Sequence, residues 1–184
     1  MRISVKLAPT FSYPELERFW READRLGFDT VWNYDHFYGL VDNPTPTLEG
    51  WTTLAAMGVV VRRARVGCMV TGVTYRNPAI LAKMAVTVDH ITSGRMDFGI
   101  GAGWHEDEHR GYGIEFPGPG TRVRMLDEAL TVIRRLWTED SVTFTGEFFT
   151  LTDALCEPKP IQRPHPPIVI GGSKPKMLRV IARH

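Results

Sequence analysis

Residues 66–103 read VGCMVTGVTYRNPAILAKMAVTVDHITSGRMDFGIGAG, and this stretch changes its periodicity twice. It opens with Val66–Val70, a short apolar run typical of a strand that is buried on both faces. A helix is predicted next, because Asn77 can cap its first turn and Pro78 suits the first helical position. Met96–Ile100 is a second buried strand, which ends in a glycine-rich turn. The stretch therefore predicts two parallel strands joined by a helix.

The same alternation continues on both sides of this unit. Further strands are predicted at 3–7, 30–34 and 167–170, and further helices at 12–27, 48–57, 126–137 and 173–184. Between 141 and 151 the pattern changes to period two around Thr145-Gly146-Glu147, which predicts an inserted β-hairpin. The chain thus contains about five strand-helix units and one hairpin.

Such an alternation defines the fold class as α/β with a parallel sheet, either doubly wound or closed into a barrel. The pattern alone does not separate the two. A complete (β/α)8 TIM barrel needs roughly 250 residues, and this chain has 184. If the fold is a TIM barrel, residues 1–184 are therefore expected to form one domain that holds only the N-terminal portion of it, incomplete at the C-terminus.

Composition limits the class of partner. Twenty-two basic and 21 acidic residues leave a formal charge of +1, so the chain offers no strong field for nucleic acid or an anionic membrane surface. Cys68 and Cys156 lack the spacing of a thiolate zinc site, and two cysteines so far apart do not suggest a disulfide framework. No stretch suits a signal peptide or a membrane span. We expect a cytoplasmic protein that binds a small molecule.

Asp35 and His36 follow directly after the predicted strand at 30–34. Barrel enzymes place reactive side chains at the carboxyl ends of their strands, where the side chains of several strands converge. Histidine is also common on ordinary surface loops. The pair is therefore a candidate catalytic site, with a surface loop as the alternative.

Two glycine-rich turns follow strands, at 99–103 and at 171–173. Glycine lets backbone N–H groups approach a phosphate or a ring closely, and a helix begins after the second turn. The first turn is not a dinucleotide fingerprint, because Trp104 occupies the place of the third glycine. Ordinary tight turns are the alternative for both.

His105-Glu106-Asp107-Glu108-His109 matches the zinc-protease pattern His-Glu-x-x-His. The hypothesis that follows is a zinc-dependent hydrolase with His105 and His109 as ligands and Glu106 as base. Glycines flank the motif on both sides, and its two central residues are charged, which is unfavourable for the stable buried helix that such an enzyme requires.

Taken together, several blocks in the same order resemble the luciferase-like monooxygenases, and especially their branch that uses coenzyme F420. The resemblance extends over essentially the whole chain. Its blocks are 31–37 (VWNYDHF), 66–78, 94–105 (GRMDFGIGAGWH), 122–137 and 158–172 (PKPIQRPHPPIVIGG).

The resemblance implies a barrel with a deazaflavin or flavin ring over its strand ends, and a bulge in the third strand near Cys68-Met69-Val70, often with a non-proline cis peptide. It further implies that His36 exchanges a proton or stabilises the reacting adduct, with Asp35 beside it. Backbone approach to the ring and its polar tail would occur at four glycines: Gly101, Gly103, Gly171 and Gly172. Trp104 stands where some F420-dependent dehydrogenases carry a glutamate acid.

Our leading hypothesis is hydride transfer or flavin-type oxygen chemistry on a small organic substrate, with coenzyme F420 as the cofactor and FMN as the alternative. It requires positions 36, 69, 101 and 171 to gather at one rim. The other hypotheses are the zinc hydrolase and a non-catalytic barrel fragment. Because the barrel is incomplete, we expect either a homo-oligomer or a complementing C-terminal barrel segment to cover the open sheet edge.

Overall fold

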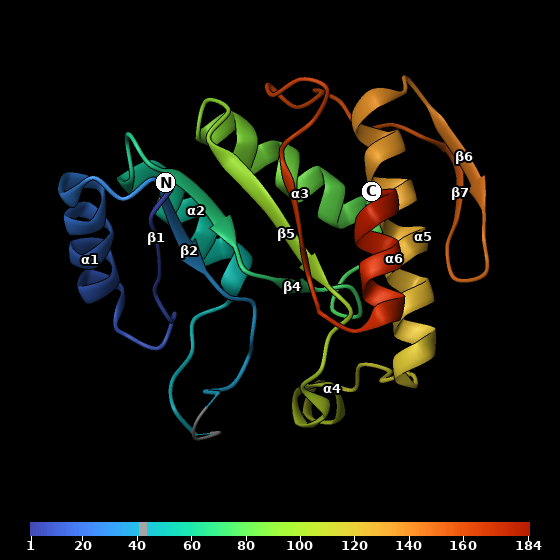
Figure 1. The fold of residues 1–184 in the computed structure, drawn as a ribbon, viewed down its shortest axis with the longest axis horizontal. Helices are drawn as coiled ribbons and strands as arrows, with labels where there is room; N and C mark the ends of the chain where they lie inside the picture. The colour runs from blue at the N-terminus through green and yellow to red at the C-terminus, as the bar shows by residue number, and fades with distance from the viewer. Residues whose placement is uncertain (41–43) are drawn as a thin grey trace.

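A computed structural model describes residues 1–40 and 44–184. Its centre is a parallel sheet that crosses the molecule diagonally in Figure 1. In spatial order its strands are β1 (Ser4–Lys6), β2 (Thr30–Asn33), β3 (Arg65–Cys68) with β4 (Thr71–Gly72), β5 (Met96–Gly101) and β8 (Ile168–Gly171).

The order of the strands decides between the two architectures that the sequence allows. If β3 and β4 are counted as one strand position and the separate β6–β7 hairpin is set aside, each position of the sheet pairs in parallel with the next along the chain. The spatial order of the strands therefore follows their order in sequence without a reversal. A doubly wound sheet contains such a reversal, whereas a β/α barrel does not. The expected barrel-type fold with five strand positions is therefore confirmed, and β1 and β8 are the two edges of the described sheet.

The third strand position is interrupted by a bulge. Gly67 pairs with Asp97 and Thr71 with Ile100, so four steps along β3 and β4 match three steps along β5. One extra residue in one strand is the definition of a β-bulge. The carbonyl of Cys68 then points at Gly99, where an added Cβ would lie 1.9 Å from that oxygen. Only glycine fits at position 99, which explains part of the glycine-rich pattern.

The helices begin and end where local chemistry directs them. Ser12 and Glu15 form a capping box at the start of α1, and Gly27 ends that helix with a φ of 91°. Asn77 caps α3 by accepting a hydrogen bond from the amide of Ala79 at 2.9 Å. The helices along the sheet are α1 (Tyr13–Leu26), α2 (Gly50–Val60), α3 (Pro78–Ile91), α5 (Pro119–Thr138) and α6 (Pro175–Arg183).

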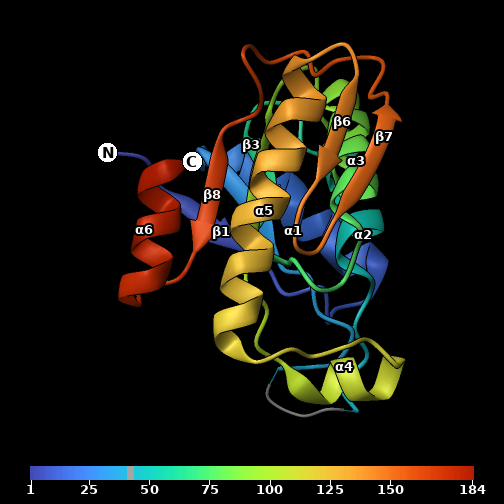
Figure 2. The ribbon, with the colours of Figure 1, turned by 90° about the vertical axis from the view of Figure 1, so that its right-hand side faces the viewer.

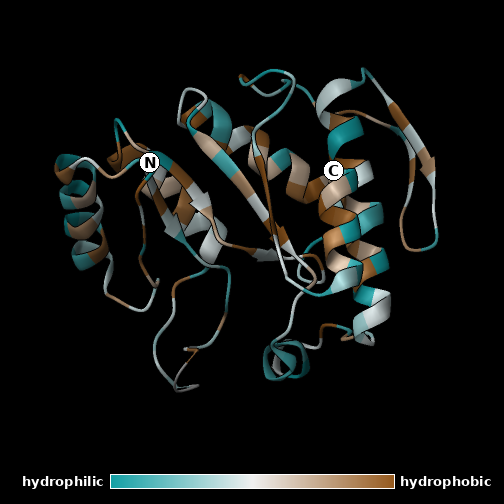
Figure 3. Ribbon diagram, viewed as in Figure 1, coloured by the Kyte–Doolittle hydropathy of each residue, from teal (hydrophilic) through white to brown (hydrophobic). Residues whose placement is uncertain are grey.

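The hydrophobic core lies between this layer of helices and the sheet. The helices pack against one another in chain order, and Figure 3 shows apolar residues on the strands and on the helix sides that face them. Trp137 is fully buried against Phe98, and its indole N–H donates to the carbonyl of Ala82 at 3.1 Å. Among the described residues, no helix is long and apolar enough to cross a bilayer.

Two segments differ from the expectation. The hairpin consists of β6 (Val142–Thr145) and β7 (Thr150–Ala154), so it continues three residues beyond 151. It packs on α5, and the carboxylate of Glu128 in that helix accepts three backbone N–H groups of the hairpin turn. Residues 106–112, for which flanking glycines argued against a stable helix, form the short helix α4 (Glu106–Tyr112). Helix α4 lies beyond the carboxyl ends of the strands (Figures 1 and 2).

Candidate functional site

A cavity of about 310 Å³ opens at the carboxyl ends of the strands, beside α4. It is lined by five of the nine predicted site residues: Asp35, His36, Met69, Val70 and Gly103. Its other walls come from Lys6, Tyr34, Leu40, Thr71, Gly72, Tyr75 and Trp104.

The remaining predicted residues do not line the cavity. Cys68 is buried in the hydrophobic core. Gly101 and Gly171 are paired across β5 and β8, and a Cβ on either would lie 2.9 Å from Cγ2 of Val70. Gly172 has a φ of 146° and lies against the side chain of Met177. Positions 36, 69, 101 and 171 are therefore gathered around one rim, although only the first two face the cavity.

The bulge and the cis peptide that the resemblance implied are both present. The peptide bond between Met69 and Val70 is cis, at the interruption between β3 and β4. The backbone there turns the Met69 side chain, which is 38% exposed, toward the cavity.

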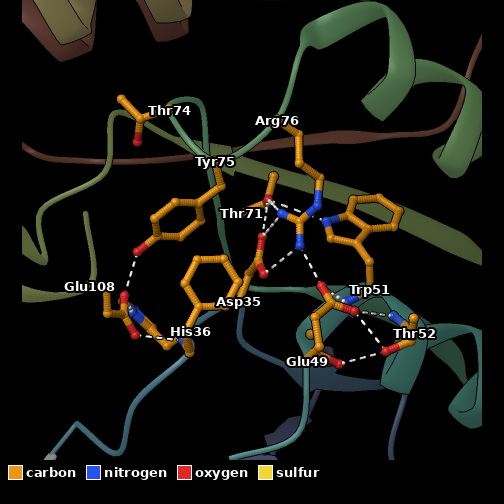
Figure 4. Close-up of polar contacts among 12 residues, drawn as sticks. Asp35, His36, Glu49, Trp51, Thr52, Thr71, Thr74, Tyr75, Arg76 and Glu108 are labelled. Atoms are coloured by element: carbon orange, nitrogen blue, oxygen red, sulfur yellow. Dashed lines mark hydrogen bonds and ion pairs between the residues drawn. The ribbon is translucent and has the colours of Figure 1, made fainter. Parts of the chain in front are cut away.

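His36 is held by a buried carboxylate that the sequence analysis did not assign to the site. Its Nδ1 lies 2.8 Å from Oε2 of Glu108, a residue of α4 (Figure 4). The hydroxyl of Tyr75 donates to the same oxygen at 2.5 Å. The backbone amides of Phe37 and Tyr38 donate to the other oxygen, at 2.6 and 2.8 Å. We refer to Glu108, His36 and Tyr75 as the Glu108 cluster.

The charge of Glu108 decides the tautomer of His36. Burial alone would raise the pKa of Glu108, but the hydrogen bonds from His36, Tyr75 and Tyr38 outweigh it and lower this pKa to about 2. An ionised carboxylate only accepts hydrogen bonds, so Nδ1 of His36 must donate. In neutral His36 the lone pair is then on Nε2, which has no hydrogen-bond partner among the described residues.

Asp35 points away from its neighbour, into a second cluster that we call the Asp35 cluster: Asp35, Arg76, Glu49 and Thr71 (Figure 4). Arg76 binds both oxygens of Asp35, at 2.5 and 3.1 Å, and also pairs with Glu49. Thr71 donates to Asp35 and accepts from the indole of Trp51 at 3.2 Å. Burial raises the pKa of Asp35, and Arg76 opposes that rise.

The His-Glu-x-x-His motif does not form a zinc site. His105 precedes α4, and its carbonyl oxygen accepts from Nδ1 of His109 at 2.7 Å. Nε2 of His109 is bonded to the hydroxyl of Thr74 at 2.6 Å. Within residues 1–40 and 44–184, no group of three or more His, Cys, Asp or Glu side chains could hold a metal ion.

Sequence reasoning missed Glu108, Tyr75 and Lys6 as parts of the site. Glu108 lies in a run of three acidic residues, and nothing in the sequence distinguishes the buried one from its exposed neighbours. Tyr75 lies in a loop without periodicity. Lys6 could have been found, because it ends the first strand and therefore lies, like His36, at the carboxyl ends of the parallel strands.

Comparison with known proteins identifies the family. The family described as luciferase-like monooxygenase matches residues 2–184. The chain belongs to this family. This luciferase-like chain is 34% identical over 168 residues to the F420-dependent glucose-6-phosphate dehydrogenase of Kineococcus radiotolerans, covering 90% of the chain and 49% of that enzyme. It is 37% identical over 97 residues to an FMNH(2)-dependent dimethylsulfone monooxygenase of Pseudomonas putida, covering 53% of the chain and 27% of that enzyme.

The solved structures agree with this assignment. An F420-dependent secondary alcohol dehydrogenase in complex with an F420-acetone adduct superposes with a TM-score of 0.84 at 26% identity. That similarity covers 98% of the luciferase-like chain and 55% of the other. The chain thus spans about half the length of the relatives that it matches.

Proposed function

We propose that this chain supplies the coenzyme-binding half of an oxidoreductase that uses coenzyme F420, with FMN as the alternative coenzyme, and acts on a small organic molecule. The observation that carries the proposal is the geometry of His36, whose Nδ1 is bonded to an ionised carboxylate while the ring lines the cavity. F420 takes precedence because the similarity to the F420-dependent glucose-6-phosphate dehydrogenase covers more of the chain than the similarity to the FMNH(2)-dependent monooxygenase.

The residues present fit a flat ring. Met69 and Trp104 line the cavity, and 38% and 61% of their respective surfaces are exposed. Such exposed apolar walls are expected where a ligand covers them. Gly103 has a φ of 76°, and a Cβ there would lie 2.9 Å from the hydroxyl of Thr74. Glycine at this position therefore keeps the backbone close to the cavity on the α4 side.

The chain's own residues would hold the ring and exchange a proton beside it. When bound, the deazaflavin or flavin would supply hydride transfer to or from the substrate. In our proposal Met69, Val70 and Trp104 form the seat of the ring, Gly101 shapes the wall beside it, and Gly171 and Gly172 lie beside its polar tail. Nε2 of neutral His36 takes a proton from the substrate, and Glu108 stabilises the imidazolium that forms. In the opposite direction the same nitrogen returns the proton.

We also propose that further structure completes the barrel. The open edges at β1 and β8 would be covered by a C-terminal barrel segment or by a second copy of the chain. A non-catalytic fragment is the competing possibility. Cooperative unfolding that shifts to a higher temperature when coenzyme is added would support the oxidoreductase over the fragment.

A coenzyme titration tests the proposal. The folded chain is titrated with F420 and with FMN, and binding is followed by the fluorescence of each coenzyme. We expect saturable binding of at least one of them. Met69→Glu, which places a charge in the seat of the ring, should weaken that binding at least tenfold.

Val59→Glu is the matched control, because Val59 is an exposed apolar residue on α2, outside the cavity. Its binding should equal that of the unaltered chain. Absence of saturable binding of either coenzyme to the folded chain would overturn the proposal.

A further inference from the structure

Lys6 is the one charged side chain on the cavity wall that has no oppositely charged partner among the residues the structure describes. Three residues of the lining can carry charge, Lys6, Asp35 and His36. Asp35 is paired with Arg76, and His36 with Glu108. Lys6 is exposed at the end of β1, and its side chain forms no ion pair or hydrogen bond within the described part of the chain.

The surroundings of Lys6 suit a ligand that joins an anionic group to an apolar body. The Lys6 ammonium lies 5.9 Å from the centre of the Tyr34 ring, which shares the same wall. The neighbouring wall contains Leu40, Met69 and Trp104. A solvated cation beside such a surface can pair with a carboxylate, sulfonate or phosphate while the rest of the ligand covers the apolar side chains.

Lys6 lies at the other edge of the sheet from the place where we propose the polar tail of the coenzyme. In our proposed arrangement the polar tail lies near Gly171 and Gly172, at the end of β8. β1 and β8 are opposite edges of the described sheet. An anion held by Lys6 is therefore on the side of the substrate and away from the phosphate of the coenzyme.

We infer that Lys6 is a specificity-determining residue that binds the anionic group of the substrate, so that the enzyme acts on small organic anions with an apolar or aromatic body. This inference rests on the proposed function, because only an enzyme that carries out that function would treat the bound anion as its substrate. The binding of an anion at Lys6 is testable without any coenzyme.

Benzoate and its neutral analogue benzamide are suitable probes, with affinities measured by ligand-detected NMR on the folded chain, with and without coenzyme. Lys6→Met should weaken benzoate binding by up to about fivefold, the upper end for an exposed ion pair, and should leave benzamide binding unchanged. Lys6→Arg should retain benzoate binding. Benzoate affinity should also fall as ionic strength rises.

The matched control is Arg62→Met, which removes one positive charge in the turn before β3, at the opposite end of the strands from the cavity. It should leave benzoate binding unchanged. FMN and riboflavin are compared in parallel, because they differ by one phosphate. The inference requires Lys6→Met to change their affinities equally or not at all.

Three results would overturn the inference: unchanged benzoate affinity in Lys6→Met, equal losses for benzoate and benzamide, or a loss for FMN that riboflavin does not share. The last result would assign Lys6 to the phosphate of the coenzyme. Failure of the unaltered chain to bind F420 or FMN would instead refute the proposed function. The benzoate measurements without coenzyme would still decide whether Lys6 binds anions.

Discussion

Asp35 and His36 are adjacent in sequence, but their side chains belong to two different clusters of hydrogen bonds. In the Asp35 cluster the carboxylate is bonded on both oxygens to Arg76, and Thr71 donates to it as well. In the Glu108 cluster the carboxylate is equally well bonded, but one ring nitrogen of His36 has no partner within residues 1–40 and 44–184, and the ring lines the cavity. We call the Asp35 cluster closed, because both oxygens of Asp35 are bonded within the protein. We call the Glu108 cluster open, because Nε2 of His36 is available to a ligand.

The difference indicates which of two adjacent polar residues is free to react. A buried charge whose bonds are all made within the protein fixes the positions of the elements that carry it. The Asp35 cluster joins the end of β2 to the start of α2 and to the loop before α3. The Glu108 cluster orients His36 and leaves one nitrogen for a ligand. We therefore expect the Asp35 cluster to control stability and His36 to control chemistry.

Breaking the Asp35 cluster should have the largest effect. Arg76→Met leaves Asp35 as a buried and unpaired carboxylate, which typically costs about 3–5 kcal/mol of unfolding free energy. Urea denaturation should show a lower midpoint with an unchanged slope. The control is Arg21→Met, which breaks an exposed pair with Glu17 on α1 and should cost less than about 1 kcal/mol. A loss below 1 kcal/mol for Arg76→Met would contradict the structural role of this cluster.

Removing the charge of Glu108 should have the next largest effect and should depend on pH. The pKa of Glu108 is lowered from 4.5 to about 2 in the folded chain. A lowered folded pKa adds stability that is complete above pH 4.5 and is lost as the pH falls toward 2. The shift corresponds to about 3 kcal/mol near neutral pH.

Glu108→Gln should therefore destabilise the chain at pH 7, and the difference from the unaltered chain should shrink on acidification. Denaturation midpoints measured from pH 7 down to the acid limit of folding check this. Glu17→Gln, which removes the carboxylate that pairs with the exposed Arg21 on α1, should show a small difference at every pH. A difference for Glu108→Gln that stayed constant with pH would show that the charge of Glu108 is not what stabilises its cluster.

Replacing His36 should separate chemistry from stability. His36→Asn keeps a donor toward Glu108 but removes Nε2. Turnover of the coenzyme-loaded enzyme should fall at least about a hundredfold, the lower end for loss of an acid-base group. The unfolding free energy should change by less than about 1 kcal/mol. Tyr34→Phe, which removes a hydroxyl from the same wall, should retain turnover within about threefold; an equal loss there would remove the special role of His36.

The order of the elements could be predicted from the sequence because it depends on local patterns. Buried apolar runs, the capping box at Ser12 and the helix start at Asn77-Pro78 act within a few residues. The bulge and the role of His36 came from resemblance. The barrel was likewise expected from resemblance alone. The pattern of apolar residues does not separate it from a doubly wound sheet, because the order of the strands is set by contacts between distant segments.

The composition of the two clusters could not be predicted from the sequence. Glu108 is 72 positions from His36, and Arg76 is 41 positions from Asp35. Neither pair follows a spacing rule, because each is formed where loops from different strands meet. Helix α4 was missed for a related reason. It is stabilised by what Glu108 and His109 bind and has only seven residues, too few for intrinsic propensity to sustain it.

The smallest expected effect concerns how α4 is held in place, and it would sharpen the distinction between the clusters. Nδ1 of His109 faces a carbonyl and must donate, so Nε2 accepts a hydrogen bond from the hydroxyl of Thr74. Thr74→Val leaves that buried nitrogen unpaired and should cost about 1 kcal/mol, whereas Thr74→Ser should restore most of the loss. Because α4 carries Glu108, hydrogen exchange of the α4 amides should accelerate in Thr74→Val while the amides of α2, held by the Asp35 cluster, stay protected. Equal acceleration in both helices would mean that the two clusters unfold as one unit and that the open cluster has no independent mobility.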